Sequence, residues 1–303
     1  MIPLSRRLAA LALVVALGAT AAAEDNAATY RKLLDEKSEN LVTVRFVQKI
    51  RFSVRGSSQE QERNAEINGT IVSAEGLIMV SNLELSPRAP RGLSFTSDSP
   101  TDIQVRFGNE EEEYEAVLAA VDSQLQLGFF RIKDLKERKL VPVLFDRAQK
   151  PEVGQELFSA HRHARGFDYA AELGSFMVTG RIAQPRKAFC TIGTIGKVGL
   201  PVFALDGTAV GVLSILDADV GAGQGGQIRC ILPNDVVDAT IKQAAEKAEE
   251  VLAKGDKDST ESKKDDEGST DEPERDHSDG GDDDDDGDGG DDGDGDGMGG
   301  GER

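Results

Sequence analysis

Residues 196–211, GKVGLPVFALDGTAVG, decide the fold that we expect for this chain. Gly196 and Gly199 permit a tight backbone turn, because glycine adopts left-handed conformations without steric cost. The turn at Leu205–Thr208 contains an Asp-Gly pair between two apolar runs, which is a strong signal for a β-hairpin. The stretch therefore predicts a tight loop followed by a hairpin. The side chain that such a loop would display is that of Val198, which has no reactive group.

Short segments in which apolar and polar residues alternate lie on both sides of this stretch, and this period of two is typical of β-strands. The first series of expected strands is Val42–Phe46, Asn68–Ser81 with a turn at Ser73–Gly76, and Ile103–Leu118 with a turn at Gly108 and Asn109. It ends with Leu127–Ile132, which is a short apolar run rather than an alternating one. The second series is Glu156–Ala160, Ser175–Ile182, Pro201–Leu205, Thr208–Ile215 and Gln227–Leu232. Pro87–Pro100 is expected to be a loop. Two groups of short strands predict an all-β chain, built as two barrels or as a sandwich.

Helical periodicity occurs only at the two ends of this β region. In Asn26–Lys37 three apolar side chains fall on one helical face. After Pro233 an apolar stripe with helical spacing begins, and Asn234 is a candidate N-cap. We therefore expect a short helix before the strands and a second short helix, at about 234–254, after them.

The first residues of the chain, Met1–Ala23, have the features of a secretory signal peptide. Arg6 and Arg7 precede the apolar run Leu8–Leu17, and three alanines end the segment. The apolar run is shorter than the ~20 residues that span a bilayer, although an uncleaved anchor is the alternative. We expect an exported protein, periplasmic or extracellular, with no membrane span after the signal is removed.

The acidity of the chain is concentrated at its other end. The whole chain has a formal net charge of −20, and residues 255–303 contain 22 Asp and Glu against 5 Lys and Arg. A segment with so few apolar residues cannot offset the entropy of ordering its backbone. We predict that 255–303 is a disordered, low-complexity acidic tail. The polyanion would repel phosphates, so nucleic acid is not an expected partner.

The tail also contains one pattern that is associated with calcium. Asp292, Asp294 and Asp296 have the spacing of the first half of an EF-hand loop, but its twelfth position is Arg303 rather than glutamate. We therefore expect, at most, weak calcium binding with affinities on the order of millimolar. The alternative is a tail that only keeps the protein soluble. No other cofactor is expected.

Five segments resemble, in the same order, segments of secreted HtrA-type serine proteases, which have a trypsin-like fold. They are residues 68–85, 102–132, 153–182, 196–215 and 228–237. The resemblance implies two six-stranded β-barrels within a domain at 24–254, the first barrel at about 41–135 and the second at about 140–233. HtrA-type proteins often have a peptide-binding PDZ domain after the protease unit, and the acidic tail occupies that place here.

The resemblance also assigns the positions of a catalytic triad. The histidine falls on Leu83, the aspartate on Gln126 and the serine on Val198. The chemistry of the family needs an imidazole to take the serine proton and a carboxylate to orient that imidazole. Leucine and valine cannot accept a proton and glutamine has no charge, so the resemblance implies a serine protease homologue whose triad is degenerate.

The loop that forms the oxyanion hole in the family corresponds to Gly196, Lys197, Val198 and Gly199. The two glycines keep the tight turn that an oxyanion pocket requires. The next family glycine is replaced by Leu200, whose side chain could fill the space that a scissile carbonyl would use.

Two histidines in SAHRHARGFD, His161 and His163, are the only imidazoles before the tail. With Asp168 they form a loop that, by resemblance, lies near the cleft of the family. Three interpretations remain open: solvated histidines in a basic loop, a metal site completed by Asp168 or another ligand, or a base for a relocated nucleophile. The candidate nucleophiles are Ser159, Ser175 and Ser214.

The only cysteines are Cys190 and Cys230. In an exported protein such a pair can form a disulfide. The alternative is that both are small buried hydrophobic residues, and their spacing does not distinguish the two.

Three functions are compatible with these observations. The first is an exported pseudoenzyme, not catalytic, that binds a peptide or a protein partner in the cleft between its barrels. The second is an active secreted trypsin-like endopeptidase with a relocated nucleophile. The third is a surface protein that binds divalent cations through its acidic tail.

Overall fold

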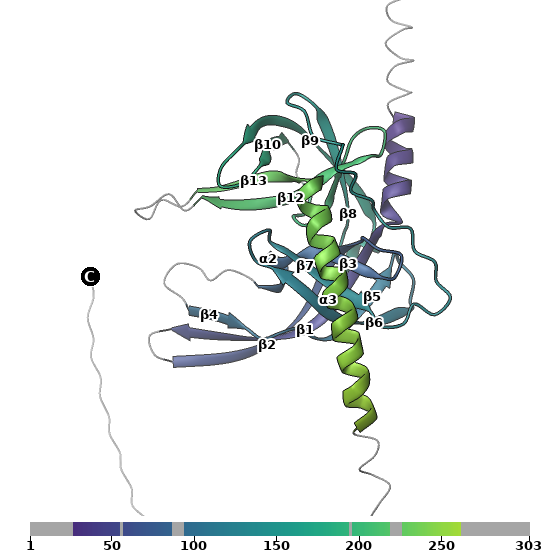
Figure 1. The fold of residues 1–303 in the computed structure, drawn as a ribbon, viewed down its shortest axis with the longest axis vertical. Helices are drawn as coiled ribbons and strands as arrows, with labels where there is room; N and C mark the ends of the chain where they lie inside the picture. The colour runs from purple at the N-terminus through teal and green to yellow at the C-terminus, as the bar shows by residue number, and fades with distance from the viewer. Residues whose placement is uncertain (1–26, 55–56, 87–93, 194–195, 219–225, 262–303) are drawn as a thin grey trace, which may run out of the picture. The chain divides into compact units, whose positions relative to one another are not determined.

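The computed structural model describes residues 27–54, 57–86, 94–193, 196–218 and 226–261 (Figure 1). The chain divides into two units, Met1–Ser259 and Thr260–Arg303, and both barrels belong to the first unit. The predicted signal peptide, Met1–Ala23, lies outside the described residues, as does the predicted tail beyond Glu261.

The first barrel contains six antiparallel strands. They are β1 (Leu41–Val54), β2 (Ser57–Ile71), β3 (Leu77–Ser81), β5 (Thr101–Phe107), β6 (Glu113–Asp122) and β7 (Leu127–Ile132). The order around the barrel is β2-β3-β7-β6-β5-β1, and pairing of β1 with β2 closes it. A seventh strand, β4 (Ser94–Ser97), pairs with the far end of β1.

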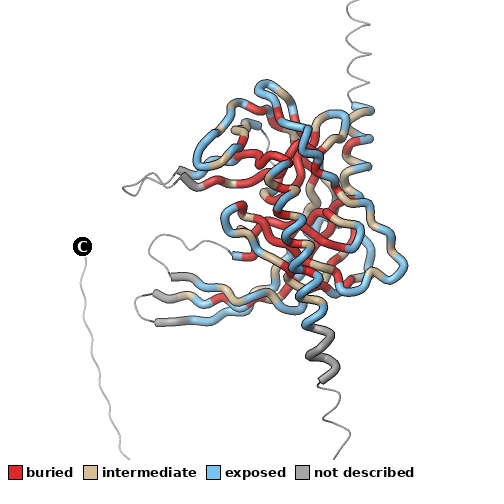
Figure 2. The backbone as a smooth tube through the Cα atoms, viewed as in Figure 1, coloured by how far each residue is buried: buried red, intermediate tan, exposed pale blue. Residues whose placement is uncertain are grey.

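The alternation that predicts these strands also fills the barrel. Val42, Val44 and Phe46 of β1 are buried together with Val105 of β5 and Phe130 of β7. Gly76 has a φ of +92° in the turn between β2 and β3, a conformation that glycine adopts at no steric cost. Buried residues are therefore concentrated inside each barrel (Figure 2).

The second barrel also closes with six antiparallel strands. They are β8 (Glu156–Arg162), β9 (Ala171–Ile182), β10 (Ala188–Gly193), β11 (Pro201–Phe203), β12 (Ala209–Ala218) and β13 (Gly226–Pro233). The order is β10-β13-β12-β11-β8-β9. A 3₁₀ turn, η1 (Arg165–Phe167), lies between β8 and β9. The prediction of an all-β chain with two six-stranded barrels is confirmed, and the arrangement fits the trypsin-like double-barrel fold.

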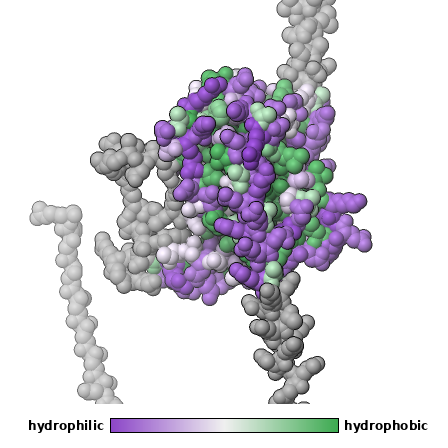
Figure 3. All heavy atoms as spheres, in the orientation of Figure 1, coloured by the Kyte–Doolittle hydropathy of each residue, from purple (hydrophilic) through white to green (hydrophobic). Residues whose placement is uncertain are grey.

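Three helices accompany the barrels in the described part of the chain. A helix at residues 27–38 precedes β1, as predicted, and a single turn, α2 (Asn82–Leu85), follows β3. The last helix, α3 (Asn234–Glu261), packs Val237, Ala244 and Ala248 into a core shared with both barrels. Its opposite face is hydrophilic (Figure 3).

No helix among the described residues is long and apolar enough to cross a membrane.

Four local predictions are wrong. β4 lies inside the expected loop Pro87–Pro100, and β10 was not expected because its pairing partners, β9 and β13, are distant in sequence. The second helix is not short: α3 continues past Lys254 to Glu261. The side chain of Asn234 does not cap α3, because Oδ1, the atom that would accept a helix N–H, has no hydrogen-bond partner among the described residues, while its amide donates to the carbonyls of Asp146 and Ala209.

Candidate functional site

The segments that contain Leu83, Gln126 and Val198 meet where the two barrels contact each other. The backbone N–H of Asn82 donates to the carbonyl of Gln126 at 2.9 Å. A Cβ placed on Gly199 would lie 2.5 Å from the backbone nitrogen of Ser81. Both contacts involve residues that lie no more than two positions from Leu83, Gln126 or Val198 in the sequence. We call this meeting point the inter-barrel junction, formed by residues 81–83, 125–126 and 198–199.

The three side chains at the junction are half-buried, and none of them is acidic or basic. Leu83 lies in α2. Gln126 adopts a left-handed backbone conformation, with a φ of +59°, in the turn before β7, and its side-chain amide donates to the carbonyl of Ser123. Val198 lies in the loop before β11. A proton cannot be transferred among these groups, because neither hydrocarbon side chain has a lone pair and the amide is neutral.

A buried hydrogen bond joins the second barrel to this point. The hydroxyl of Ser214, on β12, donates to the carbonyl of Leu125 at 3.1 Å. Leu125 precedes Gln126, so this bond holds the turn that contains Gln126 against β12. Because Ser214 is fully buried and its hydroxyl is engaged, it is poorly suited to be a relocated nucleophile.

The other candidate nucleophiles lie on β8 and β9. Ser159 is fully buried, and neither its hydroxyl nor Nδ1 of His161 has a hydrogen-bond partner among the described residues. These two groups therefore do not form a serine–histidine pair. Ser175 lies beside a cavity of about 410 Å³ that the 27–38 helix, β8 and β9 line.

The loop that resembles an oxyanion loop is held tightly. Gly199 has a φ of +87°, and its N–H donates to the carbonyl of Leu213 at 2.7 Å. Lys197 is exposed, and its ammonium donates to the carbonyl of Arg162 at 3.3 Å. Leu200 is buried in a cluster with Leu41 and Ala160. Its side chain therefore packs into the core, and the expectation that it fills an oxyanion pocket is wrong.

An unpaired strand edge begins beside this loop. β11 pairs with β12 only between Ala209 and Val212, whereas β13 pairs with β12 as far as Ala218. Beyond Leu213, no strand among the described residues pairs with the other side of β12. Such an edge presents N–H and C=O groups that can pair with another extended chain.

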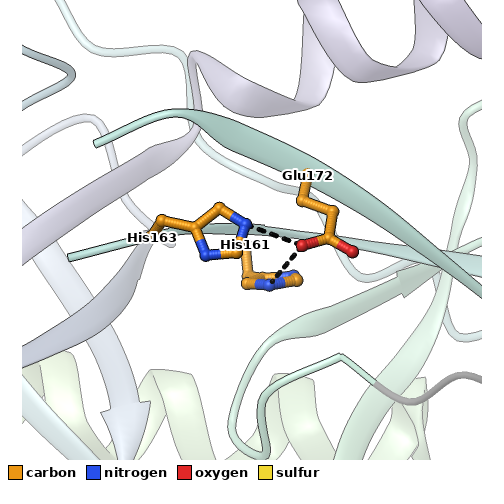
Figure 4. Close-up of side chains that lie close together, drawn as sticks. All are labelled: His161, His163 and Glu172. Atoms are coloured by element: carbon orange, nitrogen blue, oxygen red, sulfur yellow. Dashed lines mark ion pairs between the residues drawn. The ribbon is translucent and has the colours of Figure 1, made fainter. Parts of the chain in front are cut away.

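A second cluster of functional groups lies on the hairpin formed by β8 and β9. His161 is on β8, and His163 follows the end of that strand. Glu172, on β9, is opposite His161 in the strand register. Nε2 of His163 lies 2.7 Å from Oε2 of Glu172, and Nε2 of His161 lies 3.5 Å from the same oxygen (Figure 4).

The two histidines have different environments. The side chain of His161 is 13% exposed and that of His163 is 40% exposed. Burial lowers the pKa of His161, and the charge of Lys197 adds to this effect, whereas Glu172 acts in the opposite direction. His161 is therefore neutral near pH 7, and its imidazole retains a lone pair.

The structure separates these histidines from Asp168. Asp168 is exposed, with a φ of +52°, after η1, and it is not part of the cluster of ligand atoms that His161, His163 and Glu172 form. The interpretation of both histidines as solvated loop residues is wrong for His161. Glu172 was missed because its proximity depends on the β8–β9 register, which the spacing of residues does not reveal.

A side chain of the first barrel holds the segment between the two histidines. Asn68 of β2 donates from its amide to the carbonyl of Arg162 at 3.0 Å and accepts from the N–H of Arg162 at 2.6 Å. Because Arg162 lies between His161 and His163, this pair of bonds sets the position of both imidazoles relative to the first barrel.

Cys190 and Cys230 are direct cross-strand partners on β10 and β13, and both are free thiols in the structure. Burial raises the pKa of Cys230 to about 12. The thiol of Cys230 is therefore protonated at neutral pH and poorly reactive. The predicted calcium ligands Asp292, Asp294 and Asp296 lie outside the described residues.

Comparison of the sequence with protein-family models and with curated proteins finds no match.

Proposed function

We propose that this protein is an exported, non-catalytic relative of HtrA-type serine proteases that binds an extended peptide or protein segment between its barrels. One observation carries the proposal: the segments that contain Leu83, Gln126 and Val198, the residues that the sequence resemblance aligns with a catalytic triad, meet at the inter-barrel junction. The signal-like sequence at Met1–Ala23 supports export.

The edge of β12 beyond Leu213, with which no described strand pairs, supports peptide binding as the function. A segment that paired with β12 beyond Leu213 would extend the sheet and gain main-chain hydrogen bonds. It would pass Val198, because the N–H of Gly199 donates to the carbonyl of Leu213 at 2.7 Å. No proton relay exists among the described side chains there, so a bound segment would remain intact.

Peptide binding with an obstructed junction tests this function. A library of fluorescein-labelled decapeptides is screened against the full chain by fluorescence polarisation, and the tightest peptides are measured with Val198→Arg. We expect a loss of affinity of about tenfold or more. The arginine side chain would block the path of the bound peptide, and this should cost more than ~1.4 kcal/mol of binding free energy. The control is Val153→Arg, the same change at a side chain that is 54% exposed before β8.

Two results would contradict the proposal. One is cleavage of the peptides by the wild-type chain, seen by mass spectrometry, which would show an active peptidase. The other is equal binding by the Val198→Arg and wild-type chains, which would place the ligand elsewhere.

A further inference from the structure

The cluster on the β8–β9 hairpin contains three side chains of kinds that ligate metals, and their ligand atoms lie close together. One ligand atom each from His161, His163 and Glu172 can be chosen so that all three lie within 4.8 Å of one another. Zinc binds nitrogen and oxygen at about 2.0–2.2 Å, so tetrahedral ligand atoms are about 3.3 Å apart. The two distances to Oε2 of Glu172, 2.7 and 3.5 Å, lie on either side of that value.

The backbone holds these ligands without contributions from distant loops. His161 and Glu172 are paired residues of neighbouring strands, so their side chains lie on the same face of the sheet. His163 is two residues beyond His161, and its ring lies 5.3 Å from the ring of His161, measured between centroids. Figure 4 shows both imidazoles directed at one carboxylate oxygen of Glu172.

We propose that His161, His163 and Glu172 bind a divalent transition-metal ion, for which Zn²⁺ is the best match. Imidazole nitrogen suits zinc better than it suits calcium or magnesium, which prefer oxygen ligands. Three protein ligands leave a fourth position for water. The side chains of His163 and Glu172 are 40% and 47% exposed, so solvent reaches the site.

One nearby charge opposes the metal. The ammonium of Lys197 acts electrostatically on His161, and it would also repel a cation bound there. The carboxylate of Glu172 offsets this charge. Lys197 is exposed, and its one described hydrogen bond is to the carbonyl of Arg162, so its flexible side chain can move away when the ion binds.

Cobalt titration of the full chain tests the site, because tetrahedral Co²⁺ absorbs visible light and Zn²⁺ displaces it. The protein is first treated with a chelator. We expect one equivalent of Co²⁺ to give the absorption band and one equivalent of Zn²⁺ to remove it. His163→Gln should weaken metal binding by about 100-fold or more. Mutation of residues that only orient the metal ligands already lowers metal affinity 10–100-fold.

Three further measurements make the result specific. Glu172→Gln is a second ligand variant and should weaken binding as His163→Gln does. Asp168→Asn changes an exposed carboxylate on the same hairpin, outside the cluster, and should bind Co²⁺ as the wild-type chain does. Excess Ca²⁺ occupies oxygen-rich sites such as the acidic tail and should leave the band unchanged.

Either of two outcomes would overturn the proposal. The first is wild-type affinity in both His163→Gln and Glu172→Gln, with circular dichroism showing that the variants are folded. The second is the absence of a Co²⁺ band in the wild-type chain. Peptide binding measured separately would survive both outcomes, so failure here does not decide the proposed function.

Discussion

At the scale of single residues, Glu113 shows how charge is accommodated at the surface of the first barrel. Its Oε1 lies 2.5 Å from guanidinium nitrogens of Arg45 and Arg106. Burial, the largest single effect, raises the pKa of Glu113, but the hydrogen bonds and the charges of the two arginines together outweigh it, so the pKa is lowered overall. The carboxylate therefore contributes stability above its unfolded pKa, and this contribution is lost as pH falls through the lower, folded pKa.

We predict that Glu113→Gln lowers the free energy of unfolding by about 1.5–3 kcal/mol at pH 7, the range for a hydrogen bond to a charged group. The difference from the wild-type chain should shrink as pH falls through the folded pKa of Glu113. Urea denaturation at pH 7 and pH 3 measures it. The control is Glu111→Gln at an exposed neighbour, and a difference that persists unchanged at pH 3 would contradict the electrostatic explanation.

At the scale of elements, one side chain links β2 to the end of β8. The amide of Asn68 bonds both the N–H and the carbonyl of Arg162. The Asn-Gly-Thr sequence there matches a glycosylation sequon, but an amide with both atoms in hydrogen bonds to the second barrel serves a structural role. Removing it would leave the N–H of Arg162 without the acceptor that Asn68 supplies, and would leave its carbonyl only the 3.3 Å hydrogen bond from the exposed Lys197.

We predict that Asn68→Ala destabilises the fold by about 1–3 kcal/mol, the cost of leaving partly buried polar groups unsatisfied. Thermal unfolding followed by circular dichroism measures the loss. Asn64→Ala, on the exposed part of the same strand, should shift the midpoint little. Equal effects of the two substitutions would show that the link to Arg162 contributes nothing.

The strands could be predicted where their own residues alternate, as in β1 and β5, or form a short apolar run, as in β7. β10 and β4 could not, because their pairing depends on neighbours that are distant in sequence, and such tertiary context overrides local propensity. The same dependence on distant neighbours determines which site residues could be predicted from the sequence. The resemblance supplied Leu83, Gln126 and Val198 as a group, whereas Glu172 becomes a partner of His161 only through the strand register.

At the scale of the whole molecule, two closed barrels meet at the inter-barrel junction. Several contacts fix the backbone there, although the side chains of Leu83, Gln126 and Val198 cannot transfer a proton. Gly199 packs against Ser81, the N–H of Asn82 bonds the carbonyl of Gln126, and Ser214 bonds Leu125. The first and third of these contacts join the two barrels, and the second joins two segments of the first barrel, whatever the chemistry of the adjacent side chains. The double-barrel framework at this junction therefore does not depend on the chemistry of Leu83, Gln126 and Val198.

Intact-mass analysis after treatment with a fluorophosphonate probe tests this central claim most directly, because the probe modifies only an activated serine. The full chain is incubated with excess probe beside an active trypsin-like protease as a positive control. We predict that the mass of the chain does not change while the control gains one adduct. Stoichiometric modification of any serine, Ser159, Ser175 and Ser214 included, would contradict the account.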